Sequence, residues 1–207
     1  MTLSNKGATA PHSGEPVWDI AELFPPQGLW TEEEYLALTD STNHLLELSD
    51  GTIEVLPMPT ERHQEILLFL AMAINAIAQQ IGGKAFVAPL RLRLSSGRFR
   101  EPDLMLLRAA ADPRRRGAFL EGADLVMEIV SESAEDRRRD LTTKRAEYAQ
   151  AGIPEYWIID PFFETVTVLQ LRENQYIEFG HFPRQSVAQS PSFPDLRVEV
   201  SAIFDAR

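Results

Sequence analysis

The sequence predicts an α/β fold, of the α+β kind, in which a mixed β-sheet is flanked by helices. Two apolar segments, 124–130 and 155–160, have the length of buried central strands. A charged, amphipathic segment at 136–150 lies between them and predicts a helix. A strand, a helix and a strand at this spacing form a crossover that places both strands parallel in one sheet. The apolar stripe of a second long segment, 59–81, predicts another helix that covers the sheet.

The length and composition are those of one globular domain. The chain has 207 residues, of which 44% are hydrophobic and 25% are charged. Residues 1–29 are rich in Pro, Gly and Ser and are expected to form a flexible leader, so that 30–207 make the single domain. There is no cysteine, which excludes disulfides and cysteine-ligated zinc. The N-terminus lacks an apolar signal core and no apolar run reaches the length of a membrane span, so we expect a cytoplasmic protein without a membrane partner.

The elements before the first long helix are short. Thr31 and Glu34 form a capping box that begins a short helix. Strand candidates at 44–48 and 52–56 surround an Asp-Gly pair, which is a strong hairpin signal. We expect this N-terminal β-hairpin to extend one edge of the central sheet.

Further strands alternate with loops along the rest of the chain. The long helix 59–81 carries the apolar stripe Ile66, Leu67, Leu70, Ile74, Ile77 and Ile81. Pro102 interrupts the strand candidate 98–107, so its first half is expected at an edge or a bulge. The remaining predictions are a strand at 85–94, a loop at 109–122, a terminal hairpin of 164–171 and 176–182, and a short strand with a turn at 196–204.

Three charged side chains occupy positions that should be apolar. Asp103 directly precedes the apolar run 104–107, and Glu128 interrupts the central strand 124–130. Lys144 lies on the expected inward face of its helix, whose members are Leu141, Lys144, Tyr148 and Ala151. Asp140, one turn earlier, is placed to pair with Lys144. A buried carboxylate is costly unless it is paired, protonated or bound to a metal, so these residues need an explanation.

Each of the three has a structural reading and a joint functional one. Taken alone, Asp103 fits a turn or a strand start, Glu128 fits a buried acid paired with an arginine, and Lys144 fits an amine that reaches past the core edge. Taken together, two carboxylates on neighbouring strands make an open oxygen-ligand site for Mg²⁺ or Mn²⁺. A nearby amine that orients water completes the equipment for hydrolysing a phosphodiester. Their joint placement favours the site.

Several motifs resemble one family. They are ELSDG at 47–51, ERHQ at 61–64, VAPLRLRL at 87–94, EPDL at 101–104, and the run from Glu128 to Pro161 that ends in GIPEYWIIDP. These resemble the PD-(D/E)XK nuclease superfamily and, more closely, its Uma2 branch of restriction endonucleases, over about 31–204. The resemblance implies a restriction-endonuclease-like αβββαβ core and a metal-dependent endonuclease acting on DNA. The superfamily lysine is expected at position 130, where this chain has Val130, and the resemblance implies that it has moved to Lys144.

The resemblance adds two residues to the candidate site. Glu47 would be a third acidic residue and metal ligand, although strand alternation alone makes it a solvent-facing position. His63 lies at the start of the long helix; on the residues alone it is a core or capping histidine, or else a contact to phosphate or water. The resemblance strengthens the second reading of His63. A homodimer is expected, because cutting two strands requires two sites.

The charge pattern leaves more than one function open. A net charge of −11 argues against general affinity for DNA. Residues 84–116 nevertheless hold nine basic side chains against three acidic ones, which suits a phosphate backbone or simply a solvated face. A catalytically inactive nuclease-fold protein with a binding or regulatory role therefore stays an alternative, as does a hydrolase of small phosphodiesters.

Overall fold

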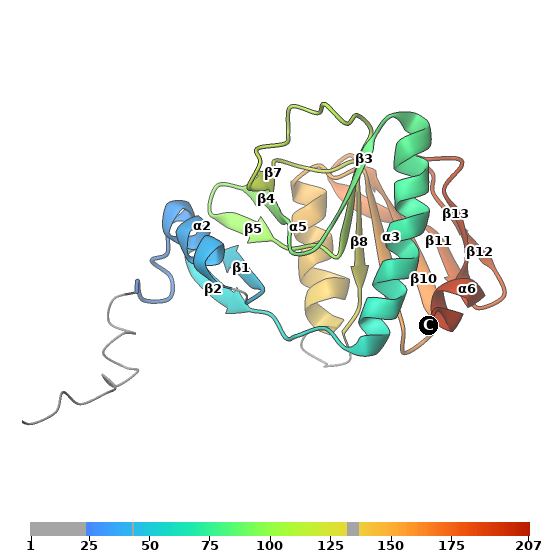
Figure 1. Cartoon of the computed structure of the whole chain (residues 1–207), viewed down its shortest axis with the longest axis horizontal. Helices are drawn as coiled ribbons and strands as arrows, with labels where there is room; N and C mark the ends of the chain where they lie inside the picture. Colours follow the sequence, from blue (N-terminus) through green and yellow to red (C-terminus); the bar gives the residue numbers. More distant parts are fainter. Residues whose placement is uncertain (1–23, 43, 132–136) are drawn as a thin grey trace, which may run out of the picture.

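The computed structural model describes residues 24–42, 44–131 and 137–207 (Figure 1). Its helices are α2 (Glu32–Ser41), α3 (Glu61–Ile81), the π-helical turn η1 (Arg139–Thr143), α5 (Lys144–Gln150) and α6 (Val200–Asp205). Its strands are β1 (Leu46–Ser49), β2 (Thr52–Val55), β3 (Lys84–Val87), β4 (Arg91–Ser95), β5 (Arg98–Arg100), β6 (Leu104–Leu107), β7 (Phe119–Leu120), β8 (Leu125–Ile129), β9 (Glu155–Asp160), β10 (Thr165–Arg172), β11 (Gln175–Pro183), β12 (Val187–Gln189) and β13 (Arg197–Glu199).

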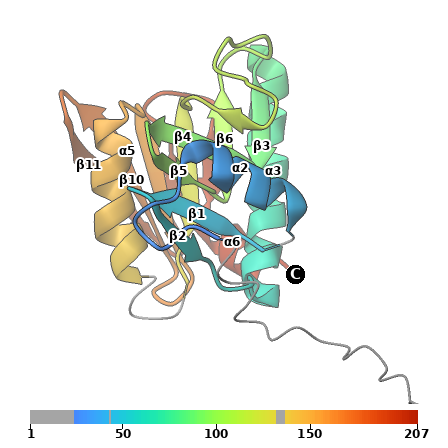
Figure 2. The ribbon, with the colours of Figure 1, turned by 90° about the vertical axis from the view of Figure 1, so that its left-hand side faces the viewer.

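A six-stranded mixed sheet forms the centre of the molecule, in the order β11-β10-β9-β8-β6-β3. The predicted crossover is confirmed, because β8 and β9 are parallel with Glu128 beside Ile158, whereas β6 runs antiparallel to β8. Helix α3 covers one face of this sheet and α5 the other, as Figure 2 shows from the side. The observed architecture agrees with the predicted mixed α/β fold.

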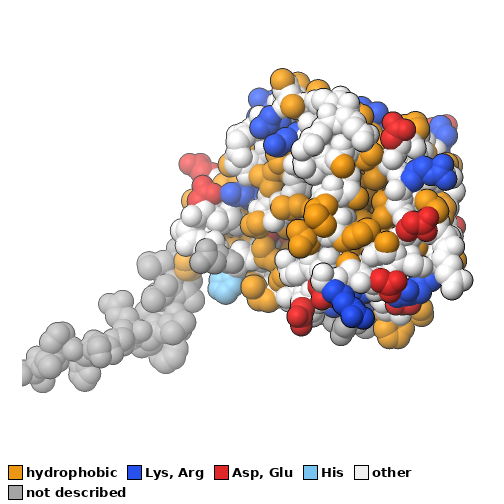
Figure 3. All heavy atoms as spheres, turned by 45° about the vertical axis from the view of Figure 1, so that its right-hand side comes forward, with side chains coloured by type: hydrophobic (Ala, Val, Ile, Leu, Met, Phe, Trp, Pro, Cys, Tyr) orange, Lys and Arg blue, Asp and Glu red, His pale blue; other side chains and the backbone are white. Residues whose placement is uncertain are grey.

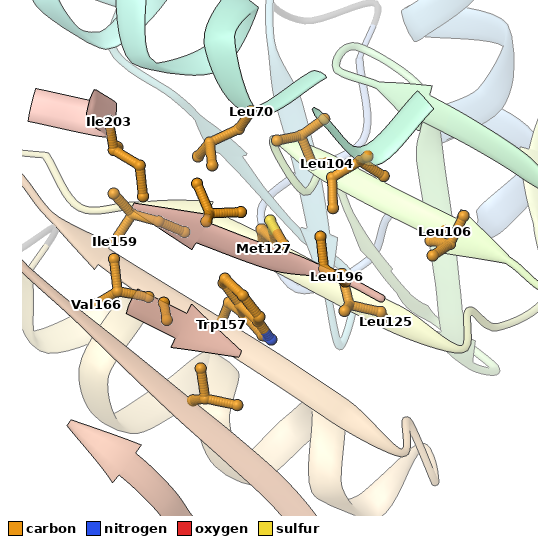
Figure 4. Close-up of a cluster of buried hydrophobic side chains, with 14 of the residues drawn as sticks. Leu70, Leu104, Leu106, Leu125, Met127, Trp157, Ile159, Val166, Leu196 and Ile203 are labelled. Atoms are coloured by element: carbon orange, nitrogen blue, oxygen red, sulfur yellow. The ribbon is translucent and has the colours of Figure 1, made fainter. Parts of the chain in front are cut away.

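Alternation along the strands sends apolar side chains into two cores. Met127 and Trp157 point to the α3 side of the sheet, where they pack in one core with Leu70 of α3. Val126 and Tyr156 point to the α5 side. Figure 4 shows the first core, where side chains from the sheet meet those of α3 and α6. Glu128 lies two residues after Val126 on β8, so its side chain points to the same face of the sheet, the face that α5 covers.

The N-terminal hairpin belongs to a second sheet, in the order β2-β1-β5-β4-β7, and does not extend the edge of the central one (Figure 2). The expected strands 85–94 and 98–107 are each divided between the two sheets. Each division falls at a proline, Pro89 or Pro102, which has no backbone N–H to continue a ladder. The second sheet packs on its own small core with α2, composed of Tyr35, Leu46, Leu48 and Phe99.

The start of the described chain is tied to the hairpin turn. The capping box of Thr31 and Glu34 is confirmed at the start of α2. Just before it, the backbone N–H of Gly28 donates to the carbonyl of Gly51 at 2.8 Å. The predicted leader thus divides into 24–29, which lie against this turn, and 1–23, which lie outside the described residues.

Helix α3 presents two different sides. Ile66, Leu70 and Ile74 are fully buried, as the predicted stripe requires, while Ile81 at the helix end is 40% exposed. The face of the molecule that α3 covers has hydrophobic side chains gathered in its middle (Figure 3). Helix α3 is long and apolar enough to span a membrane, a property that was not predicted for any segment and that core helices of soluble proteins share.

The C-terminal part follows the prediction closely. β10 and β11 form the expected terminal hairpin, paired from Thr165 with Pro183 to Arg172 with Gln175. The segment after it contains one unpredicted strand, β12, which pairs with β13 and carries the chain back over the α3 side of the sheet. Helix α6 then closes the domain beside α3.

Candidate active site

Asp103 directly precedes β6, and Glu128 lies on the paired strand β8. Continuing the register of β6 and β8 by one step from Leu104 and Met127 puts Asp103 across from Glu128. Oδ2 of Asp103 accepts a hydrogen bond from the backbone N–H of Ile129 at 2.7 Å. Both side chains line one cavity of about 700 Å³. The structure therefore brings together the two carboxylates that the sequence singled out.

Lys144 reaches this pair from the first turn of α5. Its Nζ lies 2.9 Å from Oε1 of Glu128, 3.4 Å from Oδ1 of Asp140 and 3.5 Å from Oε1 of Glu47. The side chain is only 3% exposed, and it lines the same cavity. Burial opposes the charge of Lys144, but the carboxylates of Glu128, Glu47 and Asp140 outweigh it and raise the pKa of the amine, so Lys144 is charged.

The inward face of this helix differs from the prediction by one position. Leu141 is 37% exposed, and Asp140 takes the buried place at 3%. The cause is the π-helical turn η1, which holds one more residue than an α-helical turn and so rotates the residues before it relative to those after it. The wide turn leaves the carbonyl of Asp140 free to accept a hydrogen bond from the hydroxyl of Tyr156 at 3.0 Å. The pairing of Asp140 with Lys144 is confirmed.

Glu47 is fully buried, so its reading as a solvent-facing strand residue is wrong. Its Oε2 accepts a hydrogen bond from Nη1 of Arg100 at 2.7 Å, and its Oε1 accepts one from the backbone N–H of Glu101 at 3.1 Å. Burial alone would raise the pKa of Glu47, but Lys144 and Arg100 lower it. The carboxylate of Glu47 thus lies between two cations, 2.7 Å from Nη1 of Arg100 and 3.5 Å from Nζ of Lys144.

His63 contacts the site from the first turn of α3. Its Nε2 lies 3.1 Å from Oδ1 of Asp103, and its backbone N–H donates to the capping hydroxyl of Thr60 at 3.2 Å. The helix cap of Thr60 thus fixes the backbone of His63, and the ring of His63 contacts Asp103. His63 also lines the cavity, which places it among the site residues.

Two contributors were missed by sequence reasoning. The hydroxyl of Tyr148 donates to Oε1 of Glu128 at 2.5 Å, although the periodicity of the helix predicted only an inward-facing aromatic ring. Glu101 lines the cavity at 7% exposure, and its Oε2 is buried with no hydrogen-bond partner among the described residues. The acidic residue directly before the Pro102-Asp103 pair was the available signal for Glu101.

Three carboxylates, those of Glu128, Asp140 and Glu47, lie within 3.5 Å of the amine of Lys144. Burial, with Asp103 and Asp140 nearby, raises the pKa of Glu128 to about 8 despite the opposing effect of Lys144. Burial and the charge of Glu47 also raise the pKa of Glu101 to about 8. Both carboxyl groups are therefore harder to ionise than free ones. A divalent cation would compensate the same negative charge and favour the ionised carboxylates.

The residues fit a metal of the magnesium type in one specific manner. Among the described residues no group of three or more Asp, Glu, His or Cys side chains is arranged to hold an ion. Mg²⁺ is commonly bound by one or two carboxylates, with waters and substrate phosphates completing the shell. Asp103 and Glu128 supply such a pair at an open cavity, and the partnerless oxygen of Glu101 beside them is a further acceptor. The carboxylate of Glu47 contacts Arg100 and the backbone N–H of Glu101, and its role as a third ligand stays a prediction.

Comparisons with known proteins identify a family and a similar solved structure. A family model described as "Uma2: Putative restriction endonuclease" matches residues 32–201. A crystal structure described as a putative nuclease belonging to DUF820, from Anabaena variabilis ATCC 29413, is similar with a TM-score of 0.68 and 25% sequence identity. The similarity covers 84% of this chain and 97% of that one. None of the curated proteins matches the chain.

Proposed function

The chain belongs to the Uma2 family of restriction-endonuclease-like proteins, whose model spans most of its length, and from this membership we propose that it is a metal-dependent endonuclease hydrolysing DNA phosphodiester bonds. Family and structural neighbour support a nuclease. The observation that carries the finer proposal is the amine of Lys144, 2.9 Å from Glu128, with Asp103 facing the same open cavity.

Asp103 and Glu128 would hold Mg²⁺ or Mn²⁺ in this proposal. When bound, such an ion would offset charge on the phosphate and ease deprotonation of the attacking water. Two neighbours hold the carboxylates in place: His63 contacts Oδ1 of Asp103, and Tyr148 donates to Glu128. Both contacts reduce the freedom of the ligands and so preorganise the pair.

Lys144 would position the attacking water and steady the developing negative charge. Its ammonium is kept charged by the surrounding carboxylates and kept in place by Asp140 and Glu47, which lie within 3.5 Å. Helix α5 lies on the side of the sheet that Glu128 faces, and Lys144 lines the same cavity as Asp103 and Glu128. Arg139, which also lines the cavity, is a candidate contact for a backbone phosphate.

A plasmid-nicking assay tests the assignment. In Mg²⁺ or Mn²⁺ the wild type should nick DNA, and Asp103→Asn and Lys144→Met should each lose about 100-fold or more of the rate. Asp40→Asn is the matched control, because this exposed carboxylate pairs with Arg91 outside the cavity and should keep full activity. Equal rates in all four proteins would remove the proposed roles.

The alternative is a nuclease-fold protein that binds without cutting, which Val130 and the net charge of −11 favour. Calorimetry with Mn²⁺ separates the two readings. Metal binding in the wild type that is lost in Glu128→Gln supports the enzyme, and absence of binding supports the alternative. Turnover of small phosphodiesters without turnover of DNA would instead indicate a different hydrolase.

We also propose a cytoplasmic homodimer, since cleavage of both strands of a duplex requires two active sites. Light scattering of the purified protein measures its molar mass directly. A mass near the 23.3 kDa of one chain at micromolar concentration would contradict the dimer.

A further inference from the structure

Two phenylalanines project into solvent beside the site. Phe162 is 73% exposed and Phe163 is 63% exposed, directly after the end of β9. Their rings meet edge to face, with centroids 4.8 Å apart. Adjacent large apolar side chains in the open are typical of a binding surface rather than of an ordinary solvent-facing loop.

The turn that carries them is held firmly. Oδ1 of Asp160 accepts hydrogen bonds from the backbone N–H groups of Phe162 at 3.0 Å and Phe163 at 3.2 Å. The same carboxylate accepts two hydrogen bonds from Arg137, from Nη1 to Oδ1 at 3.1 Å and from Nη2 to Oδ2 at 2.6 Å. That guanidinium lies 5.2 Å from the ring centroid of Phe163 and 5.9 Å from that of Phe162. The aromatic rings and the planar cation thus form one prearranged unit, which we call the Phe162 platform.

The Phe162 platform belongs to the rim of the active-site cavity. Phe162 and Arg137 line the same cavity as Asp103, Glu128 and Lys144. Because β9 runs parallel to β8 with Ile158 beside Glu128, the turn after Asp160 lies at the same edge of the sheet as the carboxylates. The segment between β2 and α3 supplies the remaining apolar rim with Pro57, Met58 and Pro59, and Met58 is 74% exposed.

The cavity thus has a charged floor, made by Asp103, Glu128 and Lys144, and an apolar, aromatic rim. This combination suits a nucleotide whose base is exposed. In the proposed nuclease the phosphate of a nucleotide would contact the floor through a cation held by Asp103 and Glu128, and the flat face of its base would contact the rim. In a continuous duplex the base faces are hidden in the stack, so a rim of this kind can contact only an unpaired base. Stacking does not depend on protein charge, so it also suits a chain with a net charge of −11.

We propose that the Phe162 platform stacks an unpaired base next to the scissile phosphate, so that the preferred substrate is DNA with unpaired nucleotides, such as a single strand or a flap. This inference rests on the proposed nuclease function for the phosphate contact. The stacking itself is independent of cleavage and is measured without it.

Binding of an oligonucleotide that carries 2-aminopurine tests the stacking in Ca²⁺ and in EDTA. The wild type should quench the fluorescence of the single strand and bind a duplex of the same sequence more weakly. Phe162→Ala should weaken single-strand binding by about 5- to 150-fold, the range of one base–aromatic stack. Phe162→Tyr should restore binding, and Phe179→Ala should leave it unchanged, because Phe179 is an exposed aromatic on β11 outside the cavity.

The outcomes separate the two proposals. Wild-type affinity in a folded Phe162→Ala protein, or tighter binding of the duplex without quenching, overturns the platform while leaving metal-dependent nicking intact. Quenching that depends on Phe162 in a protein that cuts no DNA with Mg²⁺ or Mn²⁺ supports the platform and removes the nuclease proposal. Preferential cleavage of the single strand, lost in Phe162→Ala, supports both.

Discussion

Replacing Lys144 with methionine keeps most of the side-chain length and removes one buried charge. The amine lies 2.9 Å from Glu128 and 3.4 Å from Asp140. At an effective dielectric constant of about 20, two unit charges about 3 Å apart attract by about 5–6 kcal/mol. The desolvation free energy of the two ions opposes this attraction and cancels part of it. Breaking a buried pair by removing one partner costs about 3–5 kcal/mol. For a domain of this size we expect the Tm of Lys144→Met to fall by about 6–20 °C.

The loss should depend on pH in a definite direction. Because burial raises the pKa of Glu128 to about 8, the folded protein holds a proton there that the unfolded chain gives up near its ordinary pKa. The stability from this group is therefore complete below about pH 4 and declines as the pH rises to about 8. Above that pH Glu128 is ionised and needs the cation, so Lys144→Met should lose more at pH 9 than at pH 6.

Thermal melts followed by circular dichroism in EDTA measure both effects. Combining Lys144→Met with Glu128→Gln should cost less than the sum of the single losses, since the second change removes the unpaired carboxylate. Lys84→Met, an exposed lysine on β3, is the control and should keep the wild-type Tm. An equal loss at pH 6 and pH 9, with additive double-variant values, would mean that packing, and not charge, accounts for the effect, and the electrostatic reasoning would be refuted.

Three further predictions concern the scaffold. Arg100→Met leaves Glu147 without both of its hydrogen bonds, at 2.7 and 2.8 Å, and should lower the urea-derived free energy of unfolding by about 3–5 kcal/mol; a loss under 1 kcal/mol would contradict this. Leu106→Ala opens a void in the fully buried core facing α3 and should cost about 2–5 kcal/mol in the same assay, with an unchanged slope. Gly51→Ala should lower the Tm, because Gly51 has a φ of 78° and a Cβ there would lie 2.5 Å from the carbonyl oxygen of Gly28; an unchanged Tm would show that the turn can move.

Local patterns were sufficient for the central part of the fold and for three site residues. The strands around Glu128 and Ile158 and the helix between them follow from period and length alone, and the crossover rule then makes them parallel. Asp103, Glu128 and Lys144 were recognisable because a charge in an apolar pattern stands out in sequence. The structure brings all three to one cavity, so this signal was informative.

Features that depend on distant partners could not be predicted in this way. The sequence around Glu47 predicts a solvent-facing strand residue, because no Lys or Arg lies near it in the chain. Its burial is possible because Arg100 and Lys144, which are distant in sequence, pair with it. The division of the strands at Pro89 and Pro102 was visible only as an interruption. Which sheet each half joins depends on the hairpin that pairs with it, and that pairing is not encoded locally.

In the proposed mechanism Lys144, on the helix, takes the place of the lysine that is absent at Val130. Val130 packs in the core on the α5 side together with Tyr148, so its position in the chain serves packing. Helix α5 supplies Lys144 and, one turn later, Tyr148, and both contact Oε1 of Glu128. The π-helical turn before α5 adds Asp140 on the same side, 3.4 Å from the amine. In the proposed mechanism an amine this close to Glu128 and lining the same cavity would act on a bound phosphate whichever element carries it, so Val130 alone does not decide between the enzyme and the binding protein.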